Sequence, residues 1–76
     1  MERWDVVKKG DRWRAERKGR AVPNTGADRK EDAVRNTAQK ARAGTKPVTV
    51  KIHKENGRIQ EERTYPRSAD PSSSPG

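Results

Sequence analysis

Large apolar residues are scarce in this chain, and most of them stand at alternate positions of short segments. Trp4 and Val6 alternate with polar residues near the start, and Trp13 and Ala15 do so after a Gly-Asp pair. The clearest alternation lies in residues 48–53, Val-Thr-Val-Lys-Ile-His. A period of two is typical of a β-strand with one buried face. We therefore expect the chain to fold around a small sheet with one apolar side.

Turn residues divide this pattern into two hairpins. Gly10 follows the first strand, and Gly supplies a positive φ at no steric cost. Asn56-Gly57 is the preferred dipeptide of a two-residue type I′ turn. The expected strands are residues 3–8, 12–17, 48–53 and 58–65, with a further short strand around Ala21-Val22.

Between the hairpins, the pattern changes to that of a helix over residues 29–43. Asp28 is the expected N-cap, with Glu31 as its capping-box partner. Gly44 is suited to the C-terminal stop, and Pro47 forbids continuation. The expected apolar stripe consists of Val34, Ala38 or Thr37, and Ala41.

The element order β-β-α-β-β predicts the α+β class, with a single small antiparallel sheet and one helix packed on one face. Only 26% of the residues are hydrophobic, so the core cannot enclose a sizeable ligand cavity. We expect a domain over residues 1–66 and an extended or disordered tail over 67–76. The candidate core is Trp4, Val6, Trp13, Ala15, Val34, Ala38, Ala41, Val48, Val50, Ile52, Ile59 and Tyr65. Pro66 follows Tyr65 and leaves open how far that ring is buried.

The formal net charge is +8 on 76 residues, which attracts polyanions and above all nucleic acid. Residues 12–20 carry five basic side chains and one Glu. We expect binding to the duplex backbone with weak sequence preference, because no exposed aromatic residue is foreseen for base stacking. A plainer interpretation is a solvated edge strand whose charges prevent aggregation. The candidate nucleic-acid-binding residues are Arg12, Arg14, Arg17, Lys18, Arg20, Lys51 and Arg58.

Catalytic patterns are missing from the sequence. Cysteine is absent, and His53 is the only histidine, expected to face solvent. Glu61 and Glu62 are adjacent in a strand and so point to opposite faces. We therefore expect a protein that is not an enzyme and uses no cofactor or metal. With no long apolar run, a cytoplasmic location is expected.

The last strand and the tail carry a family resemblance. Residues 57–66 (Gly-Arg-Ile-Gln-Glu-Glu-Arg-Thr-Tyr-Pro), Asp70-Pro71 and Gly76 resemble the C-terminal signature of a small bacterial family known as domain of unknown function 2188. Its N-terminal pattern also fits, as Trp4-x-Val6, a Gly and Trp13, and so does Lys30-Glu31-Asp32-Ala33-Val34. The chain departs from that family by its stronger basicity and by Asp32, where a small residue is usual. The resemblance implies the fold of that family and a bacterial compartment. It also implies that Thr64-Tyr65-Pro66 and the Asp70-Pro71 tail belong to the domain.

A second function stays open at this point. The chain is also compatible with a protein-interaction module of phage or mobile-element origin that docks an acidic surface of another protein. That module would use Tyr65, Pro66, Arg67 and Asp70. A monomer and a dimer joined through an edge strand are both compatible with an open sheet.

Overall fold

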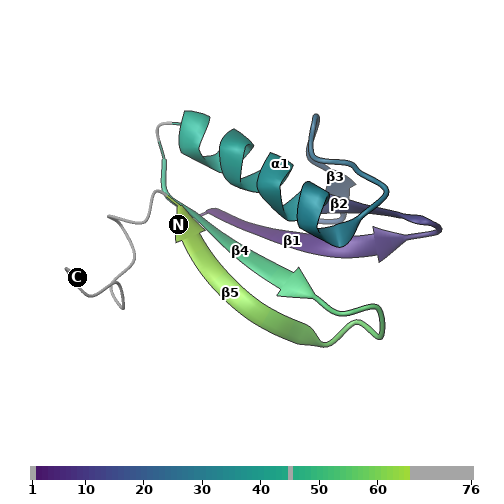
Figure 1. The fold of residues 1–76 in the computed structure, drawn as a ribbon. Coiled ribbons are helices and arrows are strands. Elements are labelled where there is room, and N and C mark those ends of the chain that lie inside the picture. Colours follow the sequence, from purple (N-terminus) through teal and green to yellow (C-terminus); the bar gives the residue numbers. More distant parts are fainter. Residues whose placement is uncertain (1, 45, 66–76) are drawn as a thin grey trace.

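The computed structural model describes residues 2–44 and 46–65, which form a five-stranded sheet and one helix on one of its faces (Figure 1). The elements are β1 (Glu2–Lys9), β2 (Arg12–Arg17), β3 (Arg20–Ala21), α1 (Lys30–Ala43), β4 (Val48–His53) and β5 (Ile59–Tyr65). The predicted α+β class is confirmed, including the short third strand. The predicted tail, residues 67–76, lies outside the described residues.

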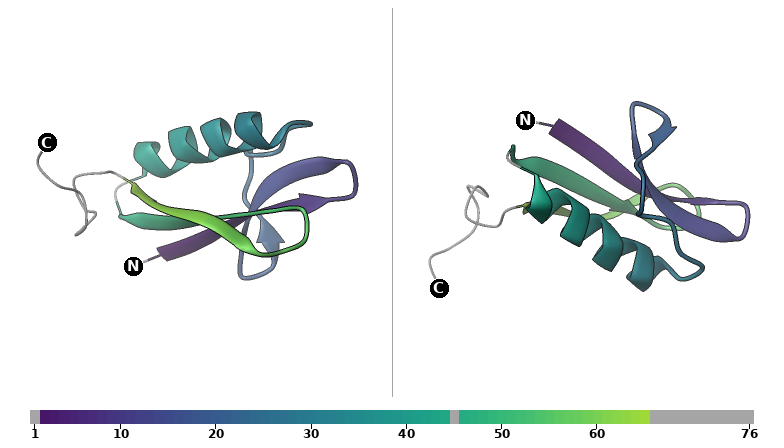
Figure 2. Two further views of the ribbon diagram at one scale, coloured as in Figure 1. Left: turned by 60° about the horizontal axis from the view of Figure 1, so that its bottom comes forward. Right: turned by 90° about the horizontal axis from the view of Figure 1, so that it is seen from above.

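The sheet has the order β3-β2-β1-β4-β5 and is antiparallel except for the pair β1–β4 (Figure 2). Two antiparallel steps make β3 run in the direction of β1. The chain then returns through α1, and a crossover of this kind delivers the next strand parallel to the one before it. β4 therefore lies parallel to β1, with Trp4 beside Val50 and Val6 beside Ile52.

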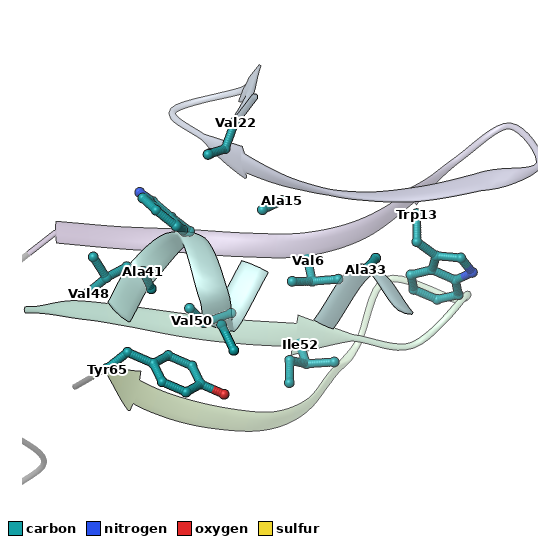
Figure 3. Packing of buried hydrophobic residues seen from close by; sticks show 12 residues of the cluster. Val6, Trp13, Ala15, Val22, Ala33, Ala41, Val48, Val50, Ile52 and Tyr65 are labelled. Atoms are coloured by element: carbon teal, nitrogen blue, oxygen red, sulfur yellow. The ribbon is translucent and has the colours of Figure 1, made fainter. Parts of the chain in front are cut away.

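The core lies between the sheet and α1, where alternate strand side chains meet small residues of the helix (Figure 3). The indole rings of Trp4 and Trp13 are buried, as predicted. Alanines on the buried face of α1 let the helix lie close to the sheet, so that rings and branched side chains fill the space. Val22 and Ala33 belong to this core although they were not predicted, and Val34 is only half-buried. The buried apolar residues are Trp4, Val6, Trp13, Ala15, Val22, Ala33, Ala38, Ala41, Val48, Val50, Ile52 and Tyr65.

Ile59 was predicted in the core, and this prediction is wrong: its side chain is 52% exposed. The cause is a β-bulge in the β4–β5 pair. Ile52 lies opposite Glu61, whereas His53 lies opposite Ile59, so that Gln60 is the extra residue. One additional residue reverses the side-chain alternation beyond it. Ile59 therefore shares the face of His53, away from the helix.

The helix begins without the predicted cap. Arg29 is the N-cap residue, with no side-chain hydrogen bond to the first turn. Asp28 instead forms an ion pair with Arg12, with Oδ1 3.3 Å from Nε. Gly44 ends the helix in an extended conformation, its N–H donating to the Ala41 carbonyl. The stop was predicted correctly, although a left-handed glycine does not supply it.

The β4–β5 turn also differs from the predicted two-residue type. Only Gly57 has a positive φ, +89°, and its N–H donates to the Lys54 carbonyl. The Lys54 N–H in turn donates to the Arg58 carbonyl. The loop thus has three residues, 55–57, with glycine in the left-handed position that a non-glycine residue rarely adopts.

Candidate functional site

The face of the sheet opposite α1, here called the open face, carries the polar side chains of the alternating strands. Register places Asp5, Val7 and Lys9 of β1 on this face, opposite Glu16, Arg14 and Arg12 of β2. Thr49, Lys51 and His53 of β4 share it. The open face is therefore a mixture of cations and carboxylates.

Arg12 and Arg14, the centre of the predicted site, are both engaged by carboxylates. Arg12 pairs with Asp28, as described above. Arg14 donates from Nε (3.0 Å) and from one terminal nitrogen (2.8 Å) to the same oxygen of Glu16. The Glu16 side chain is only 12% exposed, and Lys9 lies 3.8 Å from it. The charges of Arg12 and Arg14 are thus balanced within the fold.

The remaining basic residues of this segment lie at the end of β2, in the β2–β3 turn and at the start of β3. Arg17 has the phase of Trp13 and Ala15, and its Nε donates to Glu2 at 3.0 Å on the helix side of the sheet. Arg20 lies opposite Arg17 across the β2–β3 turn. Lys18 and Gly19 form that turn, with φ of 52° and 82°. The structure therefore does not bring Arg17 and Arg20 onto the face of Arg14.

Lys51 and Arg58 lie apart from each other. Lys51 sits in the middle of the open face, beside Asp5 on β1 and Glu62 on β5. Arg58 follows the β4–β5 turn, where its backbone N–H donates to the Asn56 side chain. The two predicted residues therefore lie in different parts of the hairpin, one on a strand and the other at the turn beyond its end.

A different group of cations lines a shallow groove near the start of β1 and β4, which lies mainly on the open face and is bordered by Glu2 and Arg17. The groove has a volume of about 990 Å³. Its cationic lining includes Arg3, Lys18, Lys46 and Lys51, none of which makes a hydrogen bond or ion pair to another described residue. We call this feature the basic groove. Its full lining is Glu2, Arg3, Asp5, Arg17, Lys18, Lys46, Pro47, Thr49, Lys51 and Glu62.

Of the four free cations in the basic groove, the sequence predicted Lys18 and Lys51 as binding residues. Arg3 and Lys46 were missed. The alternation of Arg3 with the buried Trp4 is consistent with a place on the outer face. The neighbours of Arg3 in the groove, however, follow from the parallel pairing of β1 with β4. Adjacency of β1 and β4 is a property of the topology and leaves no local signal.

His53 was predicted to face solvent, but its side chain is only 17% exposed. Its Nε2 lies 2.9 Å from Asp5 Oδ1, and its Nδ1 lies 2.9 Å from the Gly57 carbonyl oxygen. Burial lowers the pKa of His53, but the Gly57 and Asp5 contacts together outweigh it and hold the pKa above its usual value. In the described part of the chain, no group of three or more potential metal ligands occurs.

The alternative interaction site is only partly described. Tyr65 is 4% exposed, and the guanidinium of Arg42 lies 5.3 Å from its ring centroid. The ring is buried as a core residue, because β5 keeps Tyr65 on the helix side, opposite Val48. Pro66, Arg67 and Asp70 lie outside the described residues. No helix in the described ranges is long and apolar enough to cross a membrane.

Comparison with known proteins gives one match. The profile of a family described as "Uncharacterized protein conserved in bacteria (DUF2188)" matches residues 4–65, which contain nearly the whole sheet and the helix. No curated protein and no solved structure shows significant similarity to the chain.

Proposed function

This chain belongs to the DUF2188 family of bacterial proteins, and we propose that it binds the phosphate backbone of duplex nucleic acid through the basic groove. The observation that carries the proposal is the set of four cations without a carboxylate partner among the described residues, gathered on one concave surface. A polyanion releases condensed counterions when such side chains replace them, and this release drives sequence-independent binding.

The aromatic residues support backbone contact over base stacking. Trp4, Trp13 and Tyr65 are the chain's three aromatic residues of the Phe, Trp and Tyr types, and all are buried in the core. A single-strand binder uses exposed rings as stacking platforms. The basic groove is also lined by no Asn or Gln, the residues that read adenine edges. We therefore expect weak sequence preference, since phosphate contacts position a protein without specifying a sequence.

The test is a salt titration of binding to random-sequence DNA duplex, RNA duplex and single strands, followed by fluorescence anisotropy. Four contacted phosphates predict a slope of log K against log salt of about −3 to −4 for duplex DNA. Replacing Lys46 and Lys51 together by Gln should reduce the magnitude of that slope by about 2 and weaken binding to all sequences alike.

A matched control removes the same charge elsewhere. Lys54→Gln with Arg58→Gln lowers the net charge equally, at the turn beyond the other end of β4. This control should leave most of the slope intact. Equal losses in the two double variants would mean that net charge alone attracts the nucleic acid. Absence of binding to every probe at low salt would end the proposal.

A further inference from the structure

A second concave surface lies on the other side of the sheet, between α1 and β5. It has a volume of about 510 Å³, and Val34, Ala38 and Ile52 give it an apolar floor. One end is bridged by a hydrogen bond from Lys30 to Gln60, and the other by the stacking of Arg42 on Tyr65. We call it the α1–β5 groove. It shares no residue with the basic groove.

The outer wall of the α1–β5 groove is an edge strand. β5 is last in the strand order, and among the described residues only β4 pairs with it. Residues 59–63 are exposed along it. An edge strand presents backbone donors and acceptors that a further strand can satisfy. An added strand would direct alternate side chains toward the helix, and so into the groove.

We propose that β5 binds an extended acidic peptide of a partner protein as a sixth strand, with alternate acidic and apolar side chains entering the α1–β5 groove. Main-chain pairing to an exposed edge provides affinity, and pockets for alternate side chains provide specificity. Here the apolar floor would take one side chain, and the cations around it would take the acidic neighbours on the same face.

The charges of the α1–β5 groove favour an acidic occupant. Its lining has four cationic side chains, Lys30, Arg35, Arg42 and Arg63, against the carboxylates Glu31 and Glu61. Arg63 already contacts Glu61 at 2.7 Å, and Arg35 lies 3.6 Å from Asp32. A guanidinium has five N–H donors, so each of these arginines can bind a second carboxylate.

A second copy of the chain fits this edge less well. Each copy carries a formal net charge of +8, and association of two copies brings these like charges together. An acidic segment instead gains from the same field, both in encounter rate and in specificity. The charge of the molecule thus selects an acidic partner over self-association.

The test uses a fluorescent peptide, acetyl-Thr-Glu-Thr-Leu-Thr-Glu-Thr, whose Glu and Leu side chains share one face of a strand. We expect saturable binding at physiological salt, and binding at least about tenfold weaker for the peptide with Lys in place of Glu. Two further peptides carry N-methyl groups on one or the other set of alternate amides. Since only one set of amides can face β5, one of these two peptides should lose binding and the other should keep it.

Protein variants complete the design. Arg35→Glu should weaken peptide binding about tenfold, whereas Arg29→Glu should change it less than about twofold. Arg29→Glu makes the same charge change at the start of the same helix, outside the lining of the groove. Both side chains are mainly exposed, so the fold should tolerate both substitutions. The peptide series on the unaltered protein does not depend on that tolerance.

Five results would overturn the proposal. They are no saturation up to about 2 mM peptide, equal binding of both methylated peptides, and equal effects of the two arginine variants. The fourth is a set of peptide-induced amide shifts centred on Arg3 and Lys51 instead of residues 61–63, which would assign the peptide to the basic groove. Dimers of the protein that the peptide does not disperse would identify a second copy as the occupant and would equally exclude the proposal.

Discussion

At the scale of single residues, His53 is held by an acceptor at each ring nitrogen. Asp5 Oδ1 faces Nε2, and the Gly57 carbonyl faces Nδ1. A neutral imidazole has only one N–H, so both contacts are hydrogen bonds only when the ring is protonated. The charged ring thus connects β4 to β1 and to the β4–β5 turn.

Stability should therefore decrease with rising pH through the titration of His53. The pKa in the folded protein is raised, so the contribution is fully present below the unfolded value near 6.5 and is lost as pH rises through the folded value. The free energy of unfolding, measured by urea denaturation from about pH 6 to 9, should fall more steeply for the unaltered protein than for His53→Gln.

Asp5→Asn serves as the control for this pH dependence. It removes the carboxylate and leaves the Gly57 contact, so its slope should lie between those of the other two proteins. Parallel pH profiles for the unaltered protein and His53→Gln would mean that folding leaves the pKa of His53 unchanged, and would contradict the prediction.

The buried Thr25 hydroxyl gives the Ala15 N–H an acceptor where no strand carbonyl does so. This hydroxyl accepts the Ala15 N–H at 3.0 Å and donates to the Val22 carbonyl at 2.8 Å. Thr25→Val keeps the shape but leaves a buried N–H without an acceptor, which should cost about 1–3 kcal/mol in chemical denaturation.

Thr37→Val is the matched control for Thr25. Thr37 is also fully buried, but its hydroxyl donates to the Ala33 carbonyl within α1. The Ala33 carbonyl also accepts a backbone hydrogen bond of the helix, so it keeps a partner when the Thr37 hydroxyl is removed. Thr37→Val should therefore lower the free energy of unfolding by less than about 1 kcal/mol. Equal costs for both variants would mean that the Ala15 N–H finds another acceptor.

Burial at the residue level was predictable where alternation determined it. Both Trp residues and Val48, Val50 and Ile52 are in the core as predicted. Thr25 was not predictable, because a threonine between Asn24 and Gly26 has the local pattern of an exposed loop. Its burial depends on the return of residues 22–27 to β2, where Ala27 and Trp13 exchange backbone hydrogen bonds.

At the scale of elements, the β5 bulge determines which isoleucine stabilises the sheet. Ile59→Thr keeps a β-branched residue at an exposed position and should change the free energy of unfolding by less than about 0.5 kcal/mol. Ile52→Ala removes a fully buried side chain beneath α1 and should cost about 2–5 kcal/mol. A large cost at Ile59 would indicate the unbulged register, with Ile59 on the helix side.

Element positions were predicted more accurately than the details at their ends. The strand and helix bounds differ from the predicted ones by at most one residue, because hydrophobic period and turn residues are local signals. The Asp28 cap failed because Arg12, distant in the sequence, takes that carboxylate. The parallel β1–β4 pair likewise reflects the path of the crossover, which no single segment encodes.

At the scale of the whole molecule, the net charge could be counted from the sequence, but the cations without a carboxylate partner could not be identified from it. Arg14 and Glu16 stand two residues apart on one strand face, a compensation that spacing alone allows one to foresee. Arg3 and Lys46, by contrast, reach the same groove only after β1 and β4 pair. The predicted hairpin site is thus balanced in part, and the basic groove forms near the start of β1 and β4.

The two proposed surfaces lie on opposite faces of the sheet, which predicts that they bind independently at physiological salt. Charged groups projecting from opposite faces are separated by roughly 10 Å or more, and the Debye length is about 8 Å at 0.15 M salt. Saturating duplex DNA should therefore raise the peptide Kd by less than about threefold in anisotropy titrations. At about 0.01 M salt, where the Debye length is about 30 Å, the same duplex should weaken the peptide more strongly, because it neutralises the field that attracts acidic ligands. A peptide Kd that rises in proportion to duplex concentration at 0.15 M salt would mean direct competition, and hence one shared anion-binding surface in place of two.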